Sequence, residues 1–393
     1  MDANALFGDD QVDLRALKKW AVGMRWAGVP EGVIPLTSAD PDFRPAAEIR
    51  CAMADFIGDG YFPYAPREGI PGLRESIAAW LRRRKGVETD PSLTLPIDSA
   101  SAAMQAVACT ILGPGDEAVI FDPVDLLFGI SVRYAGAVPV HFPSVYRDGK
   151  WDLSALESYI TPRTKMLCLC NPHNPMGYLY TREELAFIAR LADKYGLWIM
   201  NDEIWSDIVY PEKPFVSINS LGPELNRRTV SCYGFSKGYA LPGLRAGFLY
   251  ALDKDAFAAV EHVANGSYGG VDYVTQVAMK AALDQCDYWV DAFLGRLRQN
   301  RDYMYARLAA LPGVVPTRQE ATFVTFPDIS GTGLSSEAFV RLMEDEAKVA
   351  LVPGTENWFG PRAAGHVRFC YSTSAAILQE AMDRVEHTLR KRG

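Results

Sequence analysis

Strand-like apolar runs and helical segments alternate from about residue 46 to residue 280, and this alternation most limits the folds open to the chain. A capping box from Thr181 to Glu184 opens one helical segment, and Gly196 ends it directly before the apolar run LWIM. Such alternation is typical of a mostly parallel sheet wrapped by helices. With 393 residues, the chain is too long for one compact core and suits two domains.

The C-terminal third has a different pattern. A helical pattern with few breakers runs from about residue 271 to residue 311, and Pro312-Gly313 closes it. After it come the strand-like FVTFPDI, a helix at residues 335–347, the apolar segments VALVPG and HVRFCYS, and a terminal helix. This mixture predicts a small α+β domain.

Composition excludes several classes of function. The net charge is −8 and only the terminal run at 390–392 is basic, so nucleic acid is not an expected partner. No run of about 18 apolar residues occurs and the N-terminal MDANALFGDD lacks the features of a signal peptide, so we expect a cytoplasmic protein without membrane contact. Seven cysteines without a CxxC spacing and five scattered histidines predict reduced thiols and no metal site.

Three polar motifs carry the candidate chemistry. NPHNPMG at 171–177 follows the apolar run at 166–170, and DEIW at 202–205 follows the run at 197–200. Both therefore lie just past strands, where an α/β sheet places its ligands. The third motif, GFSKGYALPGLRAG, begins at residue 234.

These motifs supply one chemically coherent set of groups. A lysine amine forms an imine with an aldehyde cofactor, a guanidinium holds a phosphate, and a carboxylate keeps a pyridine nitrogen protonated. A single Ser-Lys pair carries no weight, because most lysines lie on solvated faces. The ordered combination points to pyridoxal 5'-phosphate (PLP).

That combination resembles the fold-type-I PLP enzymes of the class I/II aminotransferase superfamily over nearly the whole chain. The resemblance implies a large PLP-binding domain at 46–284 with a mostly parallel seven-stranded sheet. Residues 1–45 and 285–393 would form a discontinuous small α+β domain. It also implies a small amino-acid substrate and a homodimer with shared active sites.

The resemblance assigns three central residues. Lys237 would be the Schiff-base lysine and the base at the substrate Cα, Asp202 would pair with the pyridinium nitrogen, and Asn174 would bond the phenolic O3' of PLP while contacting substrate. A surface lysine, a helix-capping carboxylate and an Asn-Pro turn are the structural alternatives.

The phosphate site would be formed by a helix start and two later residues. The segment SASAAM opens a predicted helix whose free N–H groups favour an anion. Family members usually have glycine where Ala100 stands and commonly serine where Gly234 stands, so one donor is missing. Plain packing of small residues is the alternative for the helix start. The phosphate ligands implied are Ser99, Ala100, Ser101, Ser236 and Arg245.

Three further positions are less orthodox. Asp125 stands where the family places an aromatic ring on the pyridine, so it would bind a substrate group or point away while Phe128 takes over. Trp205 replaces a tyrosine that donates to O3', or it walls the site. Tyr64 matches the tyrosine that reaches the neighbouring subunit's cofactor phosphate, with packing as the alternative.

Two residues would hold the substrate. Arg368, in HVRFCYS, matches the arginine that clamps the α-carboxylate, and a charge in an apolar strand is costly unless it is paired. IPLTSADPDF resembles the loop that covers the same carboxylate through its backbone, with Ala39 at the usual glycine position.

The reaction is open among several outcomes at the substrate Cα. The segments CNPHNPMGYLYTREEL, DEIWSDIVYPEKPF and SADPDF resemble the cystathionine β-lyase-like (MalY/PatB) branch, which favours a C–S lyase that eliminates a thiol from an S-substituted cysteine, leaving pyruvate and ammonia. LPGLRAG is more similar to ordinary aminotransferases, so aminotransfer is the alternative. The departures at Asp125, Gly234 and Trp205 motivate a third possibility, a specialised enzyme resembling those of lincosamide pathways, with oxygen-dependent decarboxylation and deamination of a cysteine thioether. A non-catalytic regulator is disfavoured, because no DNA-binding region is appended.

Overall fold

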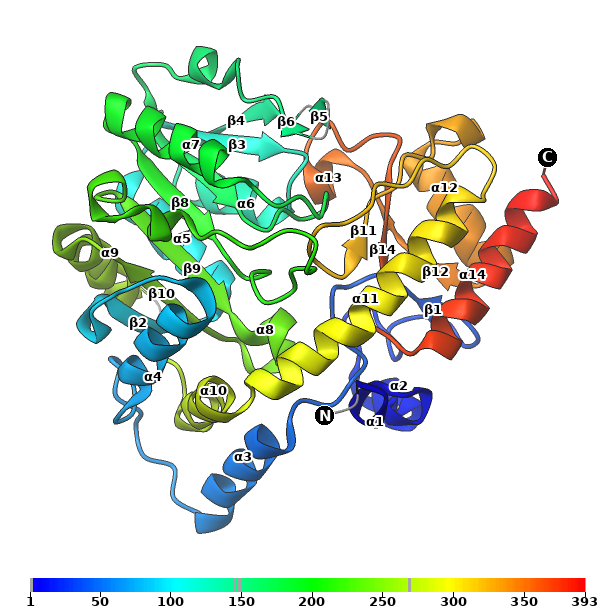
Figure 1. The fold of residues 1–393 in the computed structure, drawn as a ribbon, viewed down its shortest axis with the longest axis horizontal. Helices are drawn as coiled ribbons and strands as arrows, with labels where there is room; N and C mark the ends of the chain where they lie inside the picture. The colour runs from blue at the N-terminus through cyan, green and yellow to red at the C-terminus, as the bar shows by residue number, and fades with distance from the viewer. Residues whose placement is uncertain (1–2, 145, 148–149, 268–269, 393) are drawn as a thin grey trace.

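A seven-stranded sheet forms the centre of the larger part of the molecule in a computed structural model (Figure 1), which describes residues 3–144, 146–147, 150–267 and 270–392. All adjacent pairs among β9, β8, β7, β3 and β4 are parallel, whereas β10 is antiparallel to both of its neighbours. The predicted α/β fold with a mostly parallel seven-stranded sheet is therefore confirmed. In spatial order, the strands are β2 Thr94–Asp98, β10 Ala246–Ala251, β9 Thr229–Gly234, β8 Trp198–Asp202, β7 Thr164–Cys170, β3 Glu117–Asp122 and β4 Val138–Pro143.

Helices cover both faces of this sheet because its strands alternate apolar side chains between two cores. Cys168 and Cys170 point to the core shared with α5, α6 and α9, because residues two apart on a strand face the same side. Leu167 and Leu169 point to the opposite core, which α7 covers. The helices of this part are α3 Ala47–Asp59, α4 Leu73–Trp80, α5 Ser99–Ile111, α6 Leu126–Tyr134, α7 Arg182–Tyr195, α8 Phe235–Gly238, α9 Lys254–Ser267 and α10 Tyr273–Gln285.

Helix α7 begins and ends at its predicted residues. The Thr181 side chain accepts from the Glu184 amide, and the Glu184 carboxylate accepts from the Thr181 amide. Gly196 ends the helix in the left-handed region with φ 64°. Strand β8 then starts two residues later, at Trp198.

The N-terminal and C-terminal segments of the chain lie together in a smaller part of the molecule (Figure 1). Strand β1 Ile34–Pro35 pairs in parallel with β12 Val349–Ala350, and Phe7 packs against Trp289, with 5.0 Å between ring centroids. A second sheet has the order β11-β14-β13. The division at residues 45 and 284 stays a prediction. The remaining elements are β5 Tyr146–Arg147, β6 Lys150–Trp151, β11 Val324–Thr325, β13 Val352–Pro353, β14 Val367–Cys370, α1 Ala3–Phe7, α2 Leu14–Trp20, α11 Asp287–Ala309, α12 Ser336–Leu342, α13 Glu356–Phe359 and α14 Ala375–Arg390.

The long helical run expected from 271 to 311 is two helices. Helix α10 ends at Gln285 and α11 begins at Asp287, and the buried Cys286 between them leaves the helical region with φ −111° and ψ 17°. Asp287 favours a new helix start because its negative charge interacts favourably with the positive N-terminal end of the helix dipole. The break lets α10 pack beside α3 and α4 while α11 continues toward the smaller part (Figure 1).

Among the residues that the structure describes, no helix has both the length and the apolar character needed to cross a bilayer.

Candidate active site

A cavity of about 270 Å³ lies at the carboxyl edge of the seven-stranded sheet. A larger hollow, about 380 Å³, lies at the opposite edge around Trp198 and Arg228 and contains none of the residues singled out from the sequence. The position of a cavity at the carboxyl ends of the strands therefore identifies the candidate site better than the cavity volume does. Its lining includes Ala39, Ser99, Ala100, Ser101, Asp125, Asn174, Asp202, Trp205, Ser236, Lys237, Arg245 and Arg368.

The sheet topology explains why residues so far apart in sequence meet. Strands β2, β3, β7, β8 and β9 all run in one direction, so the segments that follow them emerge at one edge. These segments carry Ser99, Asp125, Asn174 and Lys237, while Asp202 is the last residue of β8. Because β10 is antiparallel, the residue before it, Arg245, reaches the same edge.

Lys237 lies in the short helix α8 directly after β9. Its Nζ donates to the Ala39 carbonyl oxygen at 2.7 Å and lies 5.4 Å from the centroid of the Trp205 ring. Burial lowers the pKa of Lys237, although the nearby Asp40 carboxylate partly opposes that shift. A larger share of neutral amine makes this lysine a better nucleophile and base near neutral pH.

Asp202 and Glu203 are adjacent, but they serve different environments. Asp202 is only 7% exposed, and its Oδ1 accepts from the Ile204 amide at 3.0 Å. Burial raises the pKa of Asp202 to about 7. Glu203 is instead tied into the interior by the hydroxyls of Ser217 at 2.6 Å and Tyr250 at 2.9 Å. Asp202 therefore faces the cavity as a carboxylate that a cationic partner would stabilise.

The start of α5 and Arg245 form a cluster of hydrogen-bond donors. The Arg245 Nη2 donates to Ser99 Oγ and Ser101 Oγ, each at 2.8 Å. Beside them, a Cβ on Gly247 would come within 2.9 Å of the Ala100 backbone nitrogen, so only glycine lets β10 pass this close to the helix start. Backbone N–H groups, two hydroxyls and a guanidinium suit a dianionic group.

Asn174 and Asp125 are bonded to each other. The Asn174 Nδ2 donates to Asp125 Oδ2 at 2.9 Å, and the Leu127 amide donates to Asp125 Oδ1 at 3.1 Å. The Asn174 Oδ1 is buried and has no hydrogen-bond partner. Asp125 thus lines the cavity, and the alternative in which it points away is wrong, although the fully buried Phe128 also reaches the lining.

Arg368 projects from β14 into the cavity with part of its donor set unused. It is 7% exposed, and its Nη2 donates to the Thr37 carbonyl oxygen at 3.3 Å. The buried Nε has no hydrogen-bond partner. A buried guanidinium with a free donor suits an incoming carboxylate.

Comparison with known proteins identifies the family. The model of the family "Aminotransferase class I and II" matches residues 31–385. The chain belongs to this family. The relatives include aromatic-amino-acid aminotransferase 2 of Thermococcus litoralis, 32% identical over 92% of this chain and 93% of that protein. An aspartate aminotransferase of Pyrococcus abyssi is 32% identical over 97% of this chain and 96% of its own length.

Solved structures agree on the fold of this aminotransferase-family chain. The structure of cystalysin from Treponema denticola, which contains a PLP cofactor, has a TM-score of 0.90 and covers 96% of this chain and 98% of its own. Its sequence identity is 18%, so this likeness shows the fold alone.

The cofactor is pyridoxal 5'-phosphate, and the geometry of the cavity fits that molecule. Lys237 offers an amine for the aldehyde, and Asp202 offers a buried carboxylate for the ring nitrogen. The Asn174 side chain, whose Oδ1 is unpartnered and whose Nδ2 has a second hydrogen beyond its bond to Asp125, and the donor cluster at Arg245 suit the remaining polar groups. Every polar function of the cofactor therefore has a matching side chain in one cavity.

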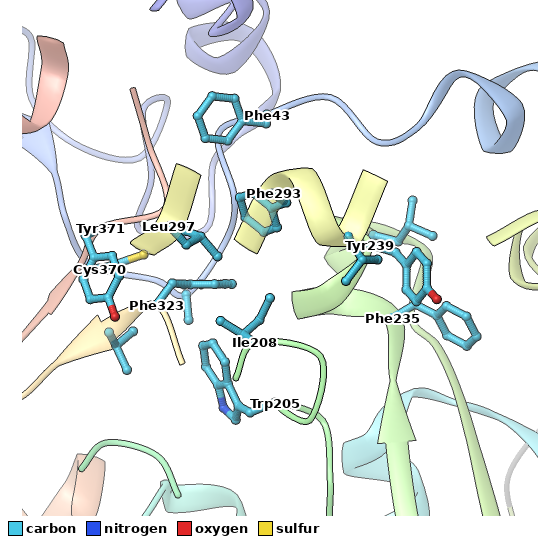
Figure 2. Close-up of a cluster of buried hydrophobic side chains, with 14 of the residues drawn as sticks. Phe43, Trp205, Ile208, Phe235, Tyr239, Phe293, Leu297, Phe323, Cys370 and Tyr371 are labelled. Carbon is cyan, nitrogen blue, oxygen red and sulfur yellow. The ribbon is translucent and has the colours of Figure 1, made fainter. Parts of the chain in front are cut away.

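Trp205 forms part of the cavity wall and of the hydrophobic core behind it. Figure 2 shows it beside Ile208 and Phe323, and its ring is 4.6 Å from that of Phe323 in an edge contact. It is only 2% exposed. This placement favours the expectation that Trp205 walls the site.

Tyr64 lies outside the cavity of its own chain. Its side chain is fully exposed, with a relative accessibility of 104%, in the segment between α3 and α4. Packing within the chain, the alternative considered from the sequence, is therefore wrong.

The contacts that anchor the loop at Ala39 were not predicted from the sequence. Asp42 is buried and forms a salt bridge with Arg25, and it also accepts from Trp26 Nε1 at 2.9 Å. These bonds tie the N-terminal segment to the loop whose Ala39 carbonyl meets Lys237. The Asp-x-Asp spacing could have drawn attention to Asp42, but no pattern in the sequence indicates Arg25 and Trp26 as its partners.

Proposed function

We propose that the chain is a PLP-dependent aminotransferase that acts on an α-amino acid. The observation that carries the proposal is one cavity that combines the Lys237 amine, the buried Asp202 carboxylate and the Arg368 guanidinium with a free Nε. Relatives about one-third identical over more than nine-tenths of the chain, which are named aminotransferases, support this choice over elimination.

Lys237 would act both in attachment and in proton transfer. PLP supplies an aldehyde that condenses with amines and a ring that withdraws electrons from the bonds at the substrate Cα. Once free, the Lys237 amine would take the proton from the substrate Cα and, as the resulting ammonium, would be the donor that returns it. Its lowered pKa keeps a share of the amine neutral for this task.

The other residues would orient the reactants. Asp202 would hold the ring nitrogen protonated, which would strengthen electron withdrawal, and Asn174 would donate to O3'. The α5 start with Ser99, Ser101 and Arg245 binds the phosphate. Ala100 and Ser236 would complete the phosphate site.

Arg368 would bind the substrate α-carboxylate while the loop at Ala39 closes over it. A two-point hold on the amine and the carboxylate presents one Cα bond to Lys237. The groups that this chain itself would contribute to proton transfer and substrate binding all line the cavity.

A single-turnover experiment tests aminotransfer. Holoenzyme mixed with excess amino acid and no acceptor should form one keto acid per active site and then stop, because the amino group stays on the cofactor. Adding a keto acid should restart the reaction. Continued release of ammonia in the absence of an acceptor would contradict aminotransfer.

C–S lyase activity is the second candidate. The three segments that resemble the cystathionine β-lyase branch all contribute to one cavity, through Ala39, Asn174 and Asp202 with Trp205. The same proton abstraction by Lys237 would then expel a thiolate from Cβ. The single-turnover experiment with S-substituted cysteines separates the routes, since a lyase releases thiol and pyruvate continuously. Oxygen uptake with release of CO₂ would instead identify the oxygen-dependent route.

A homodimer with shared sites forms part of the proposal. Large apolar side chains stand exposed at the end of α3 and after it, namely Ile57, Tyr61, Phe62 and Tyr64. Figure 1 shows α3 and the following segment at the margin of the molecule. Four large exposed apolar side chains within one short segment favour a partner, and a second copy would place Tyr64 at the neighbouring phosphate site.

Mixing two inactive variants tests the shared site. Lys237→Ala and Tyr64→Phe subunits, each inactive alone, should recover about a quarter of wild-type activity after exchange, because half of the dimers would be mixed and each would hold one intact site. Activity is measured after mass spectrometry has verified subunit exchange. No recovery in verified mixed dimers would refute the contribution of Tyr64 in trans.

A further inference from the structure

The cationic residues that line the cavity all have a role in the proposed function, but not all of the anionic residues do. The proposed function uses every cation of the lining, for the aldehyde, the phosphate and the α-carboxylate. It uses only one carboxylate, that of Asp202. The charged residues of the described lining are Lys237, Arg245, Arg368, Asp40, Asp125 and Asp202. Two carboxylates are thus left over, and no cation of the lining remains to receive a carboxylate on a substrate side chain.

The Asp125 carboxylate lines the cavity without a direct ion-pair partner among the described residues. Its oxygens accept only from neutral groups, the Leu127 amide and the Asn174 side chain. In the part of the chain that the structure describes, no lysine or arginine lies within ion-pair distance of it. The side chain is half-buried, so water screens its charge only in part.

Asp40 approaches the cavity from the opposite segment. It follows Ala39, whose carbonyl oxygen meets Lys237 Nζ, and its half-buried side chain lines the cavity. Within the described residues it forms no side-chain hydrogen bond or ion pair. Burial lowers the pKa of both Lys237 and Arg368. The Asp40 carboxylate opposes this shift at Lys237, and the Asp125 carboxylate opposes it at Arg368. The two carboxylates therefore flank the groups that would hold the substrate amine and α-carboxylate.

We propose that this cavity selects amino acids whose side chains carry hydrogen-bond donors and no negative charge, with Asp40 and Asp125 as the specificity-determining residues. The proposal rests on the proposed function only for the role of Arg368. A hydroxyl, amide or cationic side chain would donate to these carboxylates, whereas a second substrate carboxylate would be repelled. The names of the aspartate aminotransferase relatives would suggest the opposite preference.

A matched series of unreactive ligands tests this preference on the holoenzyme. Glutarate, its monoamide and its monoamidine have the same shape and share one carboxylate for Arg368, and they lack an α-amine. Titration calorimetry should give the tightest binding for the amidine and the weakest for glutarate. The expected span is about 100-fold, as for two charge-dependent contacts.

Isosteric variants assign the preference to residues. Asp125→Asn and Asp40→Asn should each narrow the amidine-to-glutarate ratio by about tenfold, the size of one charge-assisted hydrogen bond. Asp40→Asn disturbs no side-chain bond, so it reports the charge alone. The control is Asp255→Asn, an exposed residue in the first turn of α9, which should leave the ratio unchanged.

These binding measurements test the substrate preference whichever reaction the enzyme catalyses. Glutarate binding as tightly as the amidine in the wild type would overturn it without any variant. Unchanged ratios in both aspartate variants would overturn the assignment to Asp40 and Asp125. Because the ligands do not react, a lyase could show the predicted preference, and an aminotransferase could lack it.

Discussion

Replacing Lys237 with alanine should lower turnover by about 10⁴-fold, because one side chain supplies both the amine for the aldehyde and the base at Cα. No other lysine lines the described cavity. The variant should still bind PLP through the groups around Arg245 and Asp202, so equilibrium dialysis should detect cofactor while steady-state kinetics detect almost no product.

Lys194→Ala provides the matched control. Lys194 is a surface lysine with 61% of its side chain exposed, paired with Glu157 away from the cavity. It should keep wild-type kinetics and cofactor content. Normal kcat in the Lys237 variant would refute the proposed role of this lysine.

Asp202→Asn should lower turnover by about 100-fold or more, because a neutral amide no longer stabilises a protonated ring nitrogen. The amide is isosteric and can keep the bond from the Ile204 amide, so the fold and phosphate binding should persist. Parallel measurements of kcat and of PLP affinity separate these effects.

A cofactor analogue gives this prediction its control. PLP methylated on the ring nitrogen carries a fixed positive charge, so it should restore part of the activity of Asp202→Asn. A rate within about threefold of wild type in the variant with ordinary PLP would show that ring protonation is not the function of Asp202.

The sequence predicted the sheet and most of the cavity because both depend on local patterns. Apolar runs define β7 and β8. Because these strands are parallel, Asn174, which follows β7, and Asp202, which ends β8, lie at the same edge of the sheet. Lys237 was instead predicted from the motif GFSKGYALPGLRAG and its resemblance to the PLP enzymes, and it lies just after β9.

Features that depend on pairs distant in sequence were not predicted. The bond between Asp125 and Asn174 exists because β3 and β7 are neighbours in the sheet, an order that the chain sequence does not reveal. The pair of Arg25 with Asp42 is likewise visible only in three dimensions. The break at Cys286 was not predicted, because no glycine or proline lies there. It arises because the two helices pack on different parts of the molecule.

The most direct measurement is to trap the cofactor on the protein. Borohydride reduction of the holoenzyme, followed by proteolysis and mass spectrometry of the peptides, locates the lysine that carries the cofactor. The phosphopyridoxyl group should be found on Lys237, at about one group per chain. Its recovery on a different lysine, or its complete loss on denaturation after reduction, would contradict the assignment of this cavity as the PLP site.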